Sequence, residues 1–148
     1  MRRRAIATAA LAAALTGCAP TTTTAAAVVT VGPVLEFRVD IARTPDELRE
    51  GLAGRAELSE GTGMLFVFDQ RSEREVWMAG MHVALDAAWI VDDQVLAVDT
   101  LDPCTETNTT DCPRWTSPGE VDALLEVPAG SLDGIEPGTT VDVREETP

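Results

Sequence analysis

The sequence predicts an α+β domain: a compact, mainly antiparallel, β-barrel-like sheet with one short helix after the first strand. Apolar and charged side chains alternate over residues 35–41, as in a half-buried strand, and a helix-start motif follows at residues 44–47. Later apolar runs bring the strand count to roughly seven, with no internal repeat and no regular strand–helix alternation. A chain of 148 residues is long enough for one such domain.

The first strand and the helix are predicted from side-chain spacing. Residues 35–41 place apolar side chains on one face and charged ones on the other. At residues 44–47, a Thr hydroxyl and a Glu carboxylate can each accept a backbone N–H, and the Pro between them suits the first helical position. Leu48 and Leu52 share one helix face, and the neighbouring glycines predict that the helix ends by about Arg55.

Residues 63–86 are expected to form the centre of the fold, because they contain two of the three Phe and three of the four Met residues. Within them, residues 64–68 are continuously apolar, as in a strand buried on both faces. Residues 69–75 carry five charges and predict a solvated loop. Residues 76–81 predict a strand that returns to the core.

The second half of the chain predicts a hairpin, a long loop and two more strands. Apolar runs at 85–91 and 95–101 flank a polar cluster, as in a hairpin. Residues 102–116 are polar, contain two Pro and two Cys, and predict a functional or cross-linked loop. A strand is expected at 121–127, then a short helix or turn, and a closing strand at 140–143.

The N-terminus has the layout of a lipoprotein signal peptide. Three Arg residues precede residues 5–15, an apolar run too short to span a membrane as a helix. Residues 15–18, Leu-Thr-Gly-Cys, resemble the bacterial lipobox, in which the Cys is lipidated and becomes the new N-terminus. The alternative is an ordinary secretory signal with an incidental Cys18.

These features predict three segments and a location. Residues 1–17 are the signal peptide, residues 18–33 are a lipidated Cys and a Thr/Ala-rich tether, and residues 34–145 are the domain. The alternative for residues 28–31 is an edge strand. We expect an extracytoplasmic protein held at the membrane by acyl chains on Cys18.

Charge limits the classes of partner. The formal net charge is −14, and every basic residue is Arg because the chain has no Lys. Such a surface repels phosphate backbones and anionic lipid, so no nucleic-acid partner is expected and the membrane is reached through the lipid alone. A monomer with a small-molecule or protein partner at the cell envelope is the expected state.

Cys104 and Cys112 remain as a pair once Cys18 is assigned to lipid. In an oxidising compartment, two Cys in one loop predict a structural disulfide. A metal site lacks nearby ligands, since the lone His82 is distant in sequence, and the spacing is not that of a C-x-x-C redox motif. No metal and no cofactor are predicted.

An ordered series of short motifs resembles the bacterial and archaeal domain of unknown function 192 family over roughly residues 37–143. The motifs are Glu47, Gly51-Leu52, Arg55, Leu58, Gly63-Met64-Leu65-Phe66-Val67-Phe68, Trp77-Met78, Leu85-Asp86, Leu125-Glu126, Ala129-Gly130, Ile135 and Gly138. The resemblance implies a compact β-rich α+β barrel, often secreted or lipid-anchored, and no established activity.

The chain departs from the family pattern in two motifs. Ala53 stands where the family usually has Met, and Ala79-Gly80-Met81 stands where it has Lys-Asn-Thr. If that Lys and Asn contact a ligand in the family, this chain lacks the contact.

Asp86 and Glu126 are the candidates for acid–base chemistry, because each carboxylate lies among apolar neighbours where burial would separate their pKa values. In the alternative interpretation each simply faces solvent or accepts backbone N–H bonds. No further residues complete a nucleophile, a metal site or a phosphate loop.

A binding surface is predicted where small residues separate deformable Met side chains and leave the backbone accessible. Its residues are Trp77, Met78, Met81, His82, Asp86 and Arg55. His82 and Asp86 would share a face if they lay on one strand. The alternative is core filling, with Gly80 at a bulge.

The sequence therefore favours a lipid-anchored domain that binds a ligand or protein. The alternatives are a hydrolase-like enzyme that uses Asp86 and Glu126, and a structural component of the cell envelope.

Overall fold

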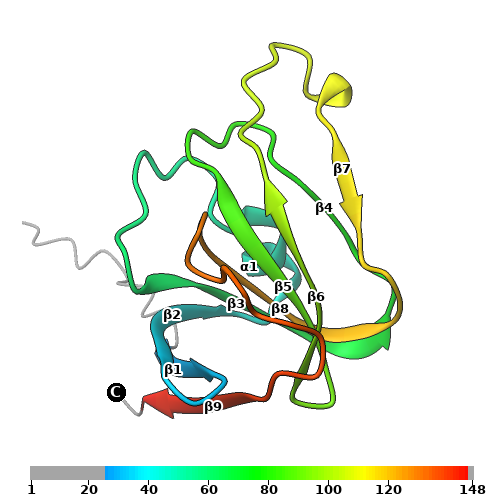
Figure 1. Cartoon of the computed structure of the whole chain (residues 1–148). Helices are drawn as coiled ribbons and strands as arrows, with labels where there is room; N and C mark the ends of the chain where they lie inside the picture. The colour runs from blue at the N-terminus through cyan, green and yellow to red at the C-terminus, as the bar shows by residue number, and fades with distance from the viewer. Residues whose placement is uncertain (1–25, 147–148) are drawn as a thin grey trace, which may run out of the picture.

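The computed structural model describes residues 26–146, which form a seven-stranded sheet, a two-stranded sheet and one α-helix (Figure 1). In chain order the elements are β1 (Ala26–Val31), β2 (Leu35–Ala42), α1 (Pro45–Glu50), β3 (Thr62–Ser72), β4 (Glu75–Trp77), β5 (Leu85–Val91), β6 (Gln94–Leu101), the 3-10 helix η1 (Thr109–Asp111), β7 (Arg114–Thr116), β8 (Val121–Pro128) and β9 (Val141–Glu146).

The large sheet has the strand order β6-β5-β8-β3-β2-β1-β9. Its pairs are antiparallel except β2–β3, which are parallel because α1 lies in the crossover between them. The predicted mainly antiparallel α+β class is confirmed. The predicted barrel is not, since β6 and β9 stand at opposite ends of the strand order. Only the start of β6 and the turn before it are hydrogen-bonded to residues 138–141, and the two strands do not pair along their lengths.

Local sequence signals account for the helix and the hairpin. The Thr44 side chain accepts the Glu47 N–H, and the Glu47 carboxylate accepts the Thr44 N–H at 2.9 Å, as the capping-box motif predicts. Strands β5 and β6 pair as the predicted hairpin, and Asp92 and Asp93 both adopt positive φ in its turn. Asp tolerates that backbone region better than most residue types.

The predicted tether is wrong for residues 26–33. Residues 26–31 form β1, which pairs with β2 on one side and β9 on the other, and Ala27, Val29 and Val31 are fully buried. The strand is thus internal to the sheet rather than at its edge. The apolar side chains of this segment are buried at every second residue, because a strand lies on either side of it. Residues 1–17 and Cys18 lie outside the described residues.

Two strand boundaries also differ from the prediction. β3 continues to Ser72, through charged residues that were expected to form a loop. This end of the strand is exposed, so its charged side chains remain in solvent while the backbone stays extended. β4 ends at Trp77 instead of continuing to residue 81. The Met81 N–H donates to the Met78 carbonyl at 3.0 Å, and Gly80 has φ +75°, so a turn replaces the end of the predicted strand.

Hydrophobic side chains are buried on both faces of the central strands. Alternate residues of β5, such as Ala88 and Ile90, pack in one cluster with Leu65 and Leu125. The intervening residues, including Trp89, pack in a second cluster with the helix side of the molecule. The second cluster contains the candidate site.

Candidate functional site

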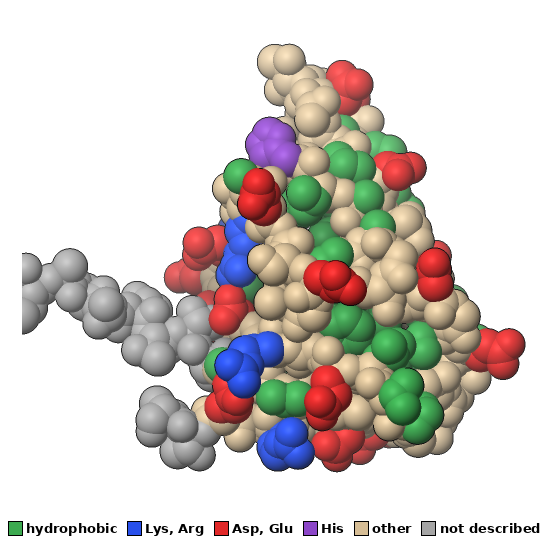
Figure 2. All heavy atoms as spheres, turned by 60° about the vertical axis from the view of Figure 1, so that its left-hand side comes forward, with side chains coloured by type: hydrophobic (Ala, Val, Ile, Leu, Met, Phe, Trp, Pro, Cys, Tyr) green, Lys and Arg blue, Asp and Glu red, His purple; other side chains and the backbone are tan. Residues whose placement is uncertain are grey.

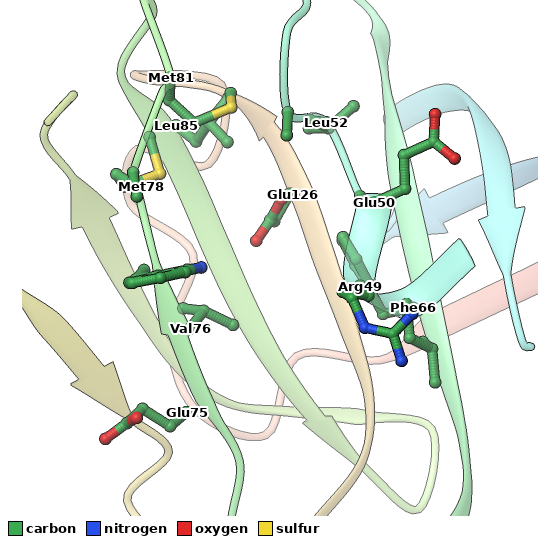
Figure 3. A pocket seen from close by; sticks show the side chains of 15 residues that line it. Arg49, Glu50, Leu52, Phe66, Glu75, Val76, Met78, Met81, Leu85 and Glu126 are labelled. Carbon is green, nitrogen blue, oxygen red and sulfur yellow. The ribbon is translucent and has the colours of Figure 1, made fainter. Parts of the chain in front are cut away.

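A cavity of about 210 Å³ opens on the helix side of the sheet (Figure 3). One wall is the end of α1 and the turn after it, and the opposite wall is β4 with the turn that follows. Strands β3, β5 and β8 contribute the floor. The lining residues are Leu48, Arg49, Glu50, Gly51, Leu52, Ala53, Phe66, Glu75, Val76, Trp77, Met78, Ala79, Met81, Leu85 and Glu126.

Glu126 is the polar group at the centre of this site. It lies on β8, opposite Met64 of β3 and Ala87 of β5, so neighbouring strands enclose it on both sides. Its side chain points into the space between Met78 and Leu52 (Figure 3). The residue is only 7% exposed, and no side chain or backbone N–H of residues 26–146 donates a hydrogen bond to its carboxylate.

Burial changes the acidity of this carboxyl group. Desolvation raises the pKa of Glu126 to about 7, because the apolar surroundings disfavour the charged form. Burying a charged carboxylate without a hydrogen-bond donor raises the free energy of the folded protein. A nearby cation or N–H group would reduce this penalty. The site can therefore accept a proton or a positively charged ligand near neutral pH.

The position of Glu126 depends on a close approach of two backbones. A Cβ added at Gly63 of β3 would lie 2.2 Å from the Glu126 carbonyl oxygen, which is far inside contact distance. Only glycine lets β3 and β8 come this close beside the carboxyl group.

The disulfide supports the opposite wall. Cys104 and Cys112 are bonded, with Cα atoms 5.8 Å apart, as predicted. The Cys104 N–H donates to the Met78 carbonyl at 3.2 Å, and the Gly80 N–H donates to the Cys104 carbonyl at 3.1 Å. The cross-linked loop thus holds the segment that carries the two cavity Met side chains.

Three of the six predicted binding residues line the cavity. Met78 and Met81 are buried, and Trp77 is 43% exposed at the rim, where the Arg114 guanidinium lies 4.4 Å from its ring centroid. These side chains come from one short segment, as the local composition indicated. Although Met78 and Met81 are buried, they also line the cavity, so they do more than fill the core.

The other three lie elsewhere. His82 is exposed and does not line the cavity, because the chain is turning at this point and the expected shared strand with Asp86 is absent. Arg55 is also exposed and pairs with Asp40 of β2 at 2.6 Å. Asp86 is buried and accepts hydrogen bonds from the Thr100 hydroxyl and the Leu132 N–H, both at 2.9 Å.

The structure does not bring Asp86 and Glu126 together. Asp86 precedes Ala87, which stands opposite Glu126, so the two carboxylates point to opposite faces of the sheet. Asp86 fixes the turn around Leu132 to β5, whereas Glu126 faces the cavity. The predicted acid–base pair is therefore wrong as a pair, and Glu126 alone remains at a site.

Sequence reasoning missed the helix-side wall. Phe66 packs near Gly51, where an added Cβ would lie 3.2 Å from the ring, and Gly51 has φ +50°. Both departures from the family pattern, Ala53 and Ala79, also line the cavity. The convergence of these distant motifs was the signal that could have identified the wall.

Within residues 26–146 there is no group of three or more His, Cys, Asp or Glu side chains placed to hold a metal ion. The helices of that same region include none with the length and hydropathy of a membrane span.

Comparisons with known proteins give a family and a fold. A protein of unknown function from Novosphingobium aromaticivorans DSM 12444, solved by crystallography, has 28% sequence identity and a TM-score of 0.72, with 88% of this chain and 94% of that chain covered. A Sinorhizobium meliloti 1021 protein, named as a candidate transcription regulator, has 23% identity and a TM-score of 0.70 over 82% of this chain and 94% of that chain, a likeness of fold alone.

No curated protein matches this chain. The family model that matches residues 27–143 is that of domain of unknown function 192, described as an uncharacterized ACR. Since the match spans most of the chain, the protein belongs to the domain of unknown function 192 family.

Proposed function

We propose that this protein is a lipid-anchored, extracytoplasmic binding domain that takes a small molecule into the cavity around Glu126. The observation that carries the proposal is a buried carboxyl group that lacks a donor from residues 26–146 and points into a cavity of about 210 Å³. Binding sites combine apolar walls with a few such orienting groups. The predicted partner carboxylate, Asp86, points to the opposite face of the sheet, so the pair on which the hydrolase alternative depended is not formed and binding is favoured over hydrolysis.

The walls suit a compact apolar ligand body. Phe66 and Leu52 lie on the helix side, and Met78 and Met81 lie on the other side (Figure 3). Thioether side chains adapt to the shape of a ligand and make favourable contacts with aromatic rings.

Occupancy of the cavity can be tested with a fragment library and amide chemical shifts. We expect some fragments to shift amide signals in residues 48–53 and 75–81 together, because both walls contact the same ligand. Ala53→Trp, at the exposed rim, is expected to weaken those fragments at least about tenfold by covering the mouth.

Ala56→Trp is the matched control, because Ala56 is exposed on the same connection but does not line the cavity. It should bind the fragments as the original chain does. If no fragment shifts both walls, or if the two Trp variants behave alike, a binding role at this cavity is ruled out.

The location is tested separately. The N-terminal sequence supports acylation of Cys18, because Arg residues and a short apolar run lead into Leu15-Thr16-Gly17-Cys18. Mass spectrometry of the protein from a bacterial host should show acyl chains on an N-terminal Cys18 and their loss in Cys18→Ala. Equal partitioning of both proteins into detergent would contradict the anchor, whatever the cavity binds.

A further inference from the structure

We propose that the cavity ligand is a small organic cation, a primary ammonium group on a compact apolar body, with the ammonium placed on Glu126. This inference rests on the proposed binding function and specifies the chemical class of its ligand. Three features support this ligand class: the charges at the cavity, its volume, and a Glu126 carboxylate that has no partner among residues 26–146.

The charges at the cavity favour a cation. Three lining side chains, Glu50, Glu75 and Glu126, are carboxylates, and Arg49 is the one cation among the lining residues. The Arg49 guanidinium is engaged with Asp46 at 2.7 Å on the exposed side of α1. With a net charge of −14, the chain also attracts cations over longer distances, and carboxylates are spread over the face that Figure 2 shows.

No cation in the described region forms an ion pair with Glu126. The chain has no Lys, so a primary ammonium on a side chain cannot be supplied from within. Arg114 lies over Trp77 and pairs with Glu75 at 2.8 Å, which fixes it at the rim. An external ammonium would give the buried carboxylate both an opposite charge and hydrogen-bond donors.

The volume limits the size of the ligand body. An apolar cavity of about 150 Å³ holds benzene. By proportion, a cavity of about 210 Å³ takes roughly eight non-hydrogen atoms. Benzylamine has that size and carries a primary ammonium, so it is the probe; benzyl alcohol is its neutral counterpart and benzoate its anionic one.

The test measures binding of the three probes to the whole 148-residue chain by titration calorimetry at pH 8, with amide shifts to locate them. We expect benzylamine to bind at the cavity about ten- to hundredfold more tightly than benzyl alcohol, the range of one charge-assisted hydrogen bond, and benzoate not to bind. Glu126→Gln keeps the shape of the side chain and should remove the preference for benzylamine.

A second variant covers the case in which Glu126→Gln fails to fold. Ala79 lines the cavity and is partly exposed, so Ala79→Lys places an ammonium at the wall on the chain itself. We expect it to weaken benzylamine at least about tenfold more than Ala79→Met, which adds similar bulk without charge.

The outcomes separate the ligand class from the binding function. If benzyl alcohol or benzoate binds the cavity as tightly as benzylamine, or if Ala79→Lys and Ala79→Met behave alike, the cation proposal fails while binding stands. If none of the probes and no library fragment shifts the two walls, the binding function fails as well. Tighter binding of a capped lysine than of benzylamine would assign the ammonium to a protein partner and overturn a small-molecule ligand.

Discussion

Removing the disulfide is expected to lower the free energy of unfolding by about 2.5 kcal/mol. The estimate is the chain-entropy cost of the short loop closed by Cys104 and Cys112, which are eight residues apart. The Cys104→Ser/Cys112→Ser protein should show this loss in urea unfolding followed by circular dichroism, with an unchanged slope if the folded surface is retained.

The same change should loosen the cavity wall. Cys104 exchanges two backbone hydrogen bonds with Met78 and Gly80, so the release of the loop frees the segment that carries Met78 and Met81. Hydrogen exchange of the Gly80 and Cys104 amides should accelerate in the double variant more than exchange in β5.

Reductant provides the control. Dithiothreitol should reproduce the double variant in the original protein and should have no effect on the variant itself. If the variant keeps full stability and slow exchange at Gly80, the loop does not support the wall, and the cavity must be held by α1 and the sheet alone.

Local chemistry explains which elements could be predicted. The capping box at Thr44 and the Asp92-Asp93 turn are encoded within a few residues, and both occur where the sequence indicated. The disulfide followed from the Cys count and the expected compartment. Each of these features can be predicted without knowing which strands pair.

Long-range pairing explains the errors. Ala26–Val31 appeared to be a tether because it is uncharged and continues a Thr/Ala-rich segment, but β9, more than a hundred residues later, pairs along its whole length. With β2 on one side and β9 on the other, the segment becomes an internal strand of the sheet. No local pattern contained that information.

The site illustrates the same limit. Met78 and Met81 were predicted from their own segment, and the cavity does adjoin them. The choice between Asp86 and Glu126 required the strand register, because Ala87 rather than Asp86 stands opposite Glu126. Sequence therefore identified both carboxylates but could not tell which one faces the cavity and which one holds a turn.

The stability of the protein should fall by about 3 kcal/mol as pH rises from 4.5 to above 7, because of Glu126. Burial raises its pKa from the ordinary value of 4.5 to about 7. Below 4.5 the carboxyl group is protonated in both states and contributes no difference. Above 4.5 the unfolded chain loses the proton first, so stability falls until the folded state also ionises near pH 7.

Urea unfolding at several pH values between 5 and 8 would measure the slope of the free energy of unfolding against pH. Glu47 does not interfere, because its hydrogen bonds to the backbone lower its pKa and its effect lies below about pH 4.5. Glu126→Gln should abolish most of the slope, whereas Glu120→Gln, on the exposed approach to β8, should retain it. An equal slope in both variants would assign the pH dependence to another group.

The pH dependence of stability also provides a test of the proposed ligand. An ammonium next to Glu126 favours the ionised carboxylate and so lowers its pKa. Saturating benzylamine should therefore stabilise the protein more at pH 8 than at pH 5, where binding must displace the carboxyl proton. Equal stabilisation at both pH values would show that the cation binds without contacting Glu126.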